Sequence, residues 1–118
     1  MNTHFKPGDN LVFQLESGFG VLRVLAVEEI DDDTIWHLSV YEDLYPDVEA
    51  AEAALATNTR MPLRTPHLAV TNYAFEKTAA AKLSNTPVRD EELAAYRLWK
   101  ESGAEASNRS VLMMLGFR

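Results

Sequence analysis

Apolar and polar positions alternate, or gather in short apolar runs, over the first part of the chain. The clearest alternation lies in residues 34–41, where Trp36 and His37 fall on opposite faces of an extended strand. Residues 21–27 form a nearly continuous apolar run rich in β-branched side chains, which indicates a strand that is buried on both faces or strongly curved. Together with residues 11–15, these stretches predict three consecutive strands.

Turn-forming residues separate the three predicted strands. Pro7 and Gly8 precede the first strand, a glycine-rich stretch at 16–20 follows it, and three aspartates at 31–33 precede the third. Proline fixes φ, glycine tolerates positive φ, and aspartate favours turns. Because connections this short join antiparallel neighbours, the pattern predicts an N-terminal antiparallel β-meander.

Helical spacing dominates two later segments. Residues 48–57 are rich in Ala and Glu and follow Asp47, which can cap a helix and interact with its dipole. Residues 90–103 predict the clearest helix, because acidic side chains open it, Tyr96 and Trp99 lie on its apolar stripe, and a glycine ends it. We therefore expect two helices beside the meander.

The remaining segments carry weaker patterns. Residues 58–66 contain two prolines and predict a loop, and residues 67–75 predict a fourth strand. Residues 77–85 fit no single pattern, and residues 111–115 fit a last strand or a short buried helix equally well.

The sum of these elements is one α+β domain over residues 1–118: an N-terminal antiparallel β-meander, with an SH3-like barrel as one form it can take, and two packed helices. Four large side chains are the first candidates for its core: Phe13, Leu25, Trp36 and Trp99.

Charge is the feature that departs most from an average chain. The 118 residues carry a net charge of −7, and between Arg23 and Arg60 there are ten acidic side chains and no lysine or arginine. A shared negative field of this kind would attract a basic partner and raise its association rate, whereas the plainer interpretation is a solvated surface that keeps the protein soluble. The acids predicted to bind a partner are Glu28, Glu29, Asp31, Asp32, Asp33, Glu42 and Asp43.

Composition also excludes several kinds of site. The chain has no cysteine, which excludes disulfides, thiolate zinc sites and cysteine nucleophiles. Its three histidines lack the short spacings of metal motifs, and no catalytic signature is present, so we predict no metal, no cofactor and no catalytic residue. No apolar run approaches the roughly 18 residues of a membrane helix, and no secretory signal is visible, so we expect a cytoplasmic protein without a membrane partner.

Two rival functions remain at this level. His37 lies in mid-strand near acidic residues and is the best candidate for a general base, so the alternative to a binding module is a small ligand-binding domain or enzyme that uses His37 with nearby carboxylates. Nucleic-acid binding is disfavoured by the net charge and would have to use the basic second half of the chain: Arg60, Arg64, Lys77, Lys82 and Arg89.

Two stretches resemble the bacterial immunity protein 26 family, which is found with polymorphic toxin systems. The first stretch contains Pro7, Gly8, Asp9, Leu11, Phe13, Leu15, Gly18, Gly20 and Val24. The second contains Pro87, Val88, Glu91, Glu92, Leu93, Tyr96 and Trp99. The resemblance implies a small protein that binds and neutralises a toxin and carries no catalytic motif. We therefore expect a non-enzymatic, immunity-like module that binds a basic partner protein through its acidic surface.

Overall fold

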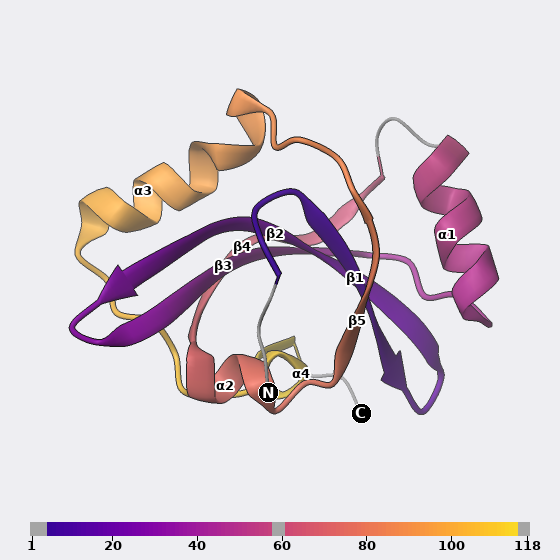
Figure 1. Cartoon of the computed structure of the whole chain (residues 1–118), viewed down its shortest axis with the longest axis horizontal. Coiled ribbons are helices and arrows are strands. Elements are labelled where there is room, and N and C mark those ends of the chain that lie inside the picture. Colours follow the sequence, from indigo (N-terminus) through magenta and orange to yellow (C-terminus); the bar gives the residue numbers. More distant parts are fainter. Residues whose placement is uncertain (1–4, 58–60, 116–118) are drawn as a thin grey trace.

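A computed structural model describes residues 5–57 and 61–115 of the chain. Five antiparallel strands form one sheet in the order β4-β3-β2-β1-β5, and short helices pack beside it (Figure 1). The predicted α+β class is confirmed. The sheet is open, because its two edge strands, β4 and β5, are not paired with each other in the described residues, so the meander does not close into an SH3-like barrel. The elements in chain order are β1 (Asp9–Leu15), β2 (Gly18–Ile30), β3 (Asp33–Tyr41), α1 (Val48–Thr57), β4 (Leu63–Thr71), α2 (Asn72–Glu76), β5 (Ala80–Asn85), η1 (Asp90–Leu93), α3 (Ala94–Ser102) and α4 (Val111–Leu115).

The predicted meander is confirmed as β1, β2 and β3. Phe13 on β1 lies opposite Gly20 on β2, and a Cβ at Gly20 would lie 2.6 Å from the Phe13 ring. The glycine therefore lets the aromatic ring cover the neighbouring strand. The register of β2 against β3 shifts at Leu25, and this irregularity bends β2 while both of its faces are buried over residues 21–25. The continuous apolar run thus reflects both burial on two faces and curvature.

One face of the sheet carries the hydrophobic core. Phe13, Leu22 and Val24 lie there, and α2 and α4 cover them through Phe75 and Val111. The side chains that belong to the same cluster on the central strands are Leu11, Leu15, Trp36, Leu38, Val40 and Val70. Trp36 stacks on Phe75 with a centroid distance of 4.4 Å and donates to Asn72 Oδ1 at 2.9 Å. Three of the four predicted core residues, Phe13, Leu25 and Trp36, are buried, whereas Trp99 is half-buried on the other face.

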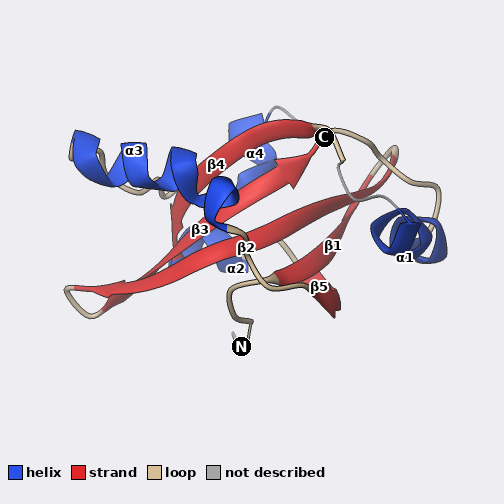
Figure 2. Cartoon of the chain, turned by 90° about the horizontal axis from the view of Figure 1, so that it is seen from above, coloured by secondary structure: helices blue, strands red, loops and turns tan. Residues whose placement is uncertain are grey.

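The opposite face of the sheet is unusually polar for a buried surface. Asn10, Arg23, His37 and Ser39 lie there and are buried. The η1–α3 segment covers part of this face, and α1 lies at the other end of the sheet (Figure 2). The buried polar side chains therefore lie on the face of the sheet that η1 and α3 partly cover.

The later segments differ from the sequence prediction at two points. The predicted strand 67–75 is wrong at both ends, because β4 begins at Leu63 and the chain turns into α2 at Asn72. The hydroxyl of Thr71 accepts a hydrogen bond from the backbone N–H of Ala74 at 3.2 Å, and this cap starts the helix. The predicted loop 58–66 is correspondingly wrong from Leu63 onward, and its residues 58–60 lie outside the described chain.

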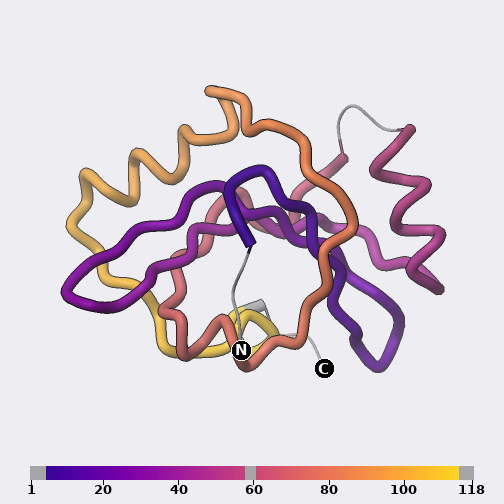
Figure 3. The backbone as a smooth tube through the Cα atoms, in the orientation of Figure 1, coloured from indigo at the N-terminus to yellow at the C-terminus, as the bar shows by residue number. Residues whose placement is uncertain are grey.

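Two undecided segments are now assigned. Residues 80–85 form the edge strand β5, which returns to pair with β1 (the tube in Figure 3), and residues 111–115 form helix α4. The clearest predicted helix begins as the single turn η1 and continues as α3 to Gly103, which has a φ of 75°. Within the described residues, no helix is long and apolar enough to cross a membrane.

Both edges of the open sheet carry features that interrupt backbone pairing. On β4, Pro66 has no N–H, and Ser107 bridges the strand with hydrogen bonds to the backbone of Ala69 and Thr71 at 2.9 and 3.0 Å. On the other side, β5 is only six residues long and carries Lys82, which pairs with Asp9 at 3.3 Å.

Candidate functional site

The acidic residues predicted to bind a partner fall into two groups. Glu28, Glu29 and residues 31–33 lie at the end of the β2–β3 hairpin, whereas Glu42 and Asp43 follow β3 at its far end. A strand of nine residues separates the two groups by about 26 Å at the usual rise per residue. The sequence leaves open whether these acids share one face, and the structure places the two groups at opposite ends of the sheet.

Glu28 differs from the other acids because its charge is matched inside the protein. Its carboxylate accepts a hydrogen bond from Tyr96 at 3.0 Å, pairs with Lys100 at 2.5 Å, and lies 2.8 Å from His37 Nε2. Partial burial of the carboxyl opposes ionisation, but these three partners outweigh it and lower the pKa of Glu28 to about 2. Glu28 is thus an internal partner of His37 and α3.

His37 is the centre of a buried network on the polar face of the sheet. It is 0% exposed, and its Nδ1 lies 2.9 Å from Nε2 of His67 on β4. Because the carboxylate of Glu28 can only accept, His37 donates through Nε2 and accepts from His67 through Nδ1. Burial lowers the pKa of His37, and burial and the neighbouring His37 lower the pKa of His67 to about 4. Both rings are therefore neutral at pH 7.

Aromatic side chains of α3 cover this network. The ring centroids of Tyr96 and Trp99 lie 4.4 and 4.9 Å from that of His37, and the His67 ring stacks on His37 at 5.2 Å. Three cavities of the described chain are lined by residues other than His37. The network connects α3 to the sheet, with the buried His37 ring between them.

A hollow at the hairpin tip combines apolar walls with an acidic rim. Its volume is about 390 Å³, and Ile30, Ile35 and Trp99 line it. Ile30 is 44% exposed, which is high for a large apolar side chain beside other apolar groups. The charged residues that line the hollow are all acidic: Asp31, Asp33 and Glu105.

The turn that carries this rim has an uncommon backbone. Asp31 and Asp32 have φ values of 52° and 66°, and they join Ile30 to its antiparallel partner Asp33 as a two-residue connection. Two consecutive positive φ values define a type I′ turn, in which Asn-Gly and Asp-Gly are preferred pairs. Asp31 suits its position, whereas Asp32 stands where glycine is preferred and adds a second negative charge at the tip.

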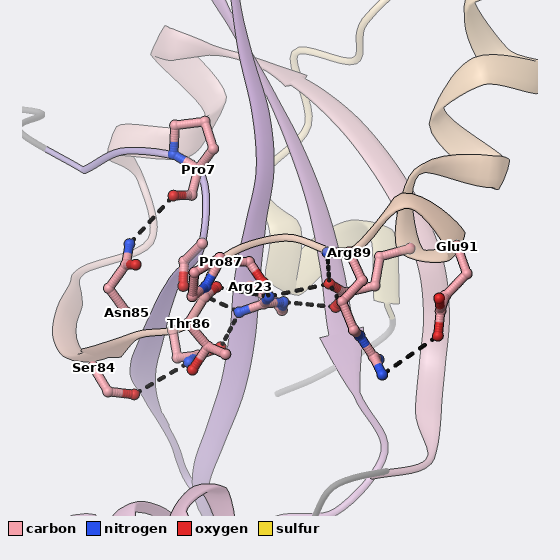
Figure 4. Close-up of polar contacts among 11 residues, drawn as sticks. Pro7, Arg23, Ser84, Asn85, Thr86, Pro87, Arg89 and Glu91 are labelled. Carbon is pink, nitrogen blue, oxygen red and sulfur yellow. Dashed lines mark hydrogen bonds and ion pairs between the residues drawn. The ribbon is translucent and has the colours of Figure 1, made fainter.

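A second polar cluster surrounds Arg23 in the middle of β2. The side chain is 4% exposed, and its guanidinium donates to both oxygens of Glu92 at 2.7 and 3.1 Å. It also donates to the carbonyls of Gly8, Thr86 and Pro87 and to Asn10 Oδ1 at 2.8–3.2 Å (Figure 4). Burial of the Glu92 carboxyl opposes ionisation, and the bond from Arg23 outweighs it, so the pKa of Glu92 is lowered. We call this set the Arg23 clamp, because it ties β2 to the segment between β5 and η1.

The basic residues of the second half do not gather in one place. Lys77 lies over the ring of Tyr73 at 4.3 Å, Lys82 pairs with Asp9, and Arg89 lies 3.4 Å from Glu91. Arg60 lies outside the described residues. In the described chain, no group of three or more histidine, aspartate and glutamate side chains has the geometry to hold a metal ion.

Sequence reasoning missed two features of this region. Arg23 gave no signal, because a single arginine in an apolar strand belongs to no motif. His67 lies 30 residues from His37, and the two meet only because β4 pairs with β3. Comparisons of the chain with protein-family models, curated proteins and solved structures find no match.

Proposed function

We propose that the protein is a non-enzymatic binding module that takes a basic segment of a partner protein at the tip of the β2–β3 hairpin. One observation carries this proposal: the hollow at the tip has apolar walls, and its charged lining residues are all acidic. A lysine or arginine side chain has an apolar stem and a charged head. The stem would pack on Ile30 and Trp99, and the head would meet the carboxylates of Asp31 and Asp33.

The balance of forces supports a contact that is both apolar and charged. An exposed ion pair contributes only about 0.2–1 kcal/mol, so the acids alone would give weak binding. Burial of apolar surface on Ile30 and Trp99 would supply the rest. The acids would mainly raise the association rate and select basic partners, and both effects weaken as salt is added.

The backbone of the turn supports the same assignment. Residues held at positive φ cost free energy unless they suit that region, and such positions gather at functional sites. Asp32 stands at the position where glycine is preferred and keeps its charge at this cost. The acids at the far end of the sheet, Glu42 and Asp43, belong to the proposal only as part of the long-range field.

The resemblance to the immunity protein 26 family sharpens the class of partner. A toxin that acts on nucleic acid needs a basic surface, and a basic surface is what an acid-rimmed hollow would bind. The partner that we propose is therefore a toxin with a lysine- or arginine-rich active surface. The cytoplasm is the expected place of this encounter.

Two matched double variants test the proposal. Asp31→Asn with Asp33→Asn removes two charges from the tip and leaves the turn intact, because asparagine tolerates positive φ. Glu42→Gln with Asp43→Asn removes the same charge from the far end. Each protein would be used to capture partners from the lysate of the native host at low and moderate salt, with mass spectrometry as the readout.

We expect the wild type and the far-end variant to retain the same basic protein, and the tip variant to lose it. The captured protein would then be purified, and its affinity for all three proteins measured by calorimetry. Equal affinity of the tip variant and the wild type would rule out the hairpin tip as the binding site. Capture of no basic protein by the wild type would count against the function itself.

A further inference from the structure

The largest of the three cavities lies on the polar face of the sheet, away from the hairpin hollow. Its volume is about 540 Å³, and it is bounded by Leu25 on β2, by Leu63 and Pro66 on β4 and by Ala94 and Ala95 at the start of α3. A volume of this size lies within the range of sites that hold small molecules.

A second cavity extends the first one toward α1. Its volume is about 380 Å³, and Tyr41, Met61, Arg89 and Glu92 line both cavities. The shared residues make the two cavities neighbours, so together they form one trough that crosses the sheet from the start of α3 to Leu55 on α1.

The side chains of α3 explain why this space stays open. Tyr96 and Trp99 are large and rest on the His37 ring, where they hold that part of the helix away from the sheet. The preceding turn faces the sheet with Ala94 and Ala95, which are too small to fill the gap above Ser39.

Two hydroxyl groups in the cavity wall form no hydrogen bond with the described part of the protein. Ser39 is 3% exposed, and its hydroxyl makes no hydrogen bond with any described residue. Among the described residues only Thr78 Oγ1 is both buried and unpaired, so the Ser39 oxygen keeps accessible surface and is available to a group bound in the cavity. Tyr41 lines the same wall, and its hydroxyl is also unpaired in the part of the chain that is described. Burial raises the pKa of Tyr41, so this group stays neutral.

The charges around the cavity are already matched. Arg23 pairs with Glu92, and Arg89 pairs with Glu91. The guanidinium N–H groups of Arg23 are already used in hydrogen bonds within the clamp. A charged ligand would therefore lose hydration without finding a free counter-charge. An uncharged ligand would suffer no such loss.

We propose that this cavity binds an uncharged, aromatic small molecule that carries a polar group such as an amide. The aromatic body would lie against Leu25 and Met61, whose thioether suits contact with a ring. The amide would donate to and accept from the hydroxyls of Ser39 and Tyr41, because a hydroxyl can take either role. This site is separate from the hairpin tip and does not depend on partner binding there.

Three small probes of nearly equal shape test both the site and its preference. Benzamide is neutral, benzoate is an anion, and benzamidine is a cation. Each would be titrated into protein labelled with ¹³C at the methionine methyls, and the NMR signals of Met61, which lines the cavity, and Met113, which is exposed, would be followed.

We expect benzamide to shift the Met61 signal saturably, with a dissociation constant in the millimolar range, and to leave Met113 unchanged. Ser39→Ala would weaken benzamide about tenfold, which is the effect of losing one hydrogen bond in a buried site. Ala95→Leu would fill the cavity and abolish the shift, whereas Ala53→Leu on the exposed side of α1 would not change it. Thermal unfolding of each variant would show that it is folded.

The proposal fails if none of the probes shifts Met61, or if Ala95→Leu leaves the shift of benzamide unchanged. Equal or tighter binding of benzoate or benzamidine would overturn the assignment of an uncharged ligand. The cavity and the hairpin tip share no lining residue. The Ala95→Leu variant should therefore still capture a basic partner, so that the failure of one proposal can be told from the failure of the other.

Discussion

The Arg23 clamp and the His37 network bury ionisable groups on the same face of the same sheet, but they do so in different ways. Arg23 carries a permanent charge, which one carboxylate and three backbone carbonyls surround. His37 and His67 are neutral. In the hydrogen bond between them His67 Nε2 donates and His37 Nδ1 accepts, and His37 Nε2 donates to Glu28. The clamp therefore stabilises the fold independently of pH above the range in which Glu92 titrates, whereas the network depends on protonation.

The largest expected effect comes from removing the clamp. Arg23→Met would remove both guanidinium bonds to the part-buried Glu92 carboxylate, which keeps the backbone N–H of Arg89 as a donor, and the bonds to the carbonyls of Thr86 and Pro87. We expect it to lower the free energy of unfolding by about 3–5 kcal/mol. Urea unfolding would measure this loss. Arg97→Met is the matched control, because Arg97 forms an exposed pair with Asp90 and its loss should change the free energy of unfolding far less.

A double variant separates a buried charge pair from simple packing. Arg23→Met with Glu92→Met removes both charges and should recover part of the loss, because no part-buried carboxylate then lacks the guanidinium that matched its charge. If the double variant is less stable than Arg23→Met, the clamp does not act through the pairing of its charges.

The next effect is the pH dependence of the free energy of unfolding, which should arise from the His37 network and not from the Arg23 clamp. The pKa values of His37 and His67 lie below the ordinary 6.5 in the folded protein, so the unfolded chain binds more protons below pH 6.5. The contribution of these two histidines to the free energy of unfolding is fully present above pH 6.5. It falls as the pH decreases toward about 4, the pKa of His67. Allowing for the partial exposure of His67, we expect a loss on the order of 1–2 kcal/mol.

His67→Gln tests the origin of this pH dependence. Glutamine can still donate to His37 Nδ1 but does not titrate, so the fall in stability between pH 6.5 and 4 should become shallower. Arg23→Met should keep the wild-type slope over this range. An unchanged slope in His67→Gln would assign the pH dependence to other groups.

The smallest expected effect concerns the hydroxyl that joins α3 to the network. Tyr96→Phe keeps the ring on His37 and removes one hydrogen bond to Glu28, which should cost about 1 kcal/mol. It should also raise the pKa of Glu28 above its value of about 2, as measured by NMR titration. Tyr73→Phe, at an exposed tyrosine, is the control and should change neither quantity.

The sequence predicts one half of this fold better than the other. The meander follows from local signals, because alternation and short turns specify neighbouring antiparallel strands. The end of β4 was missed because Thr71 starts a helix within an apolar run. Strand β5 gave no pattern, since it lies at an edge with one partner strand and mostly exposed or half-buried side chains.

The candidate site shows a similar division. His37 is recognisable from its place in a strand near acidic residues, and Glu28 does lie beside it. The pairing of His37 with His67, and of Arg23 with Glu92, joins residues 30 and 69 positions apart. Such contacts depend on the order of strands in the sheet, which residue spacing does not encode.

The interrupted edges of the sheet have a consequence for how the protein behaves among its own copies. An open sheet offers unpaired backbone groups to other chains, and this is a common route to aggregation. On β4, Pro66 and the backbone bridge to Ser107 leave fewer backbone groups to pair with another chain. On β5, the strand is short and carries a lysine, which also disfavours such pairing. Features that oppose edge-to-edge association are therefore present at both edges, independently of the acidic side chains at the hairpin tip.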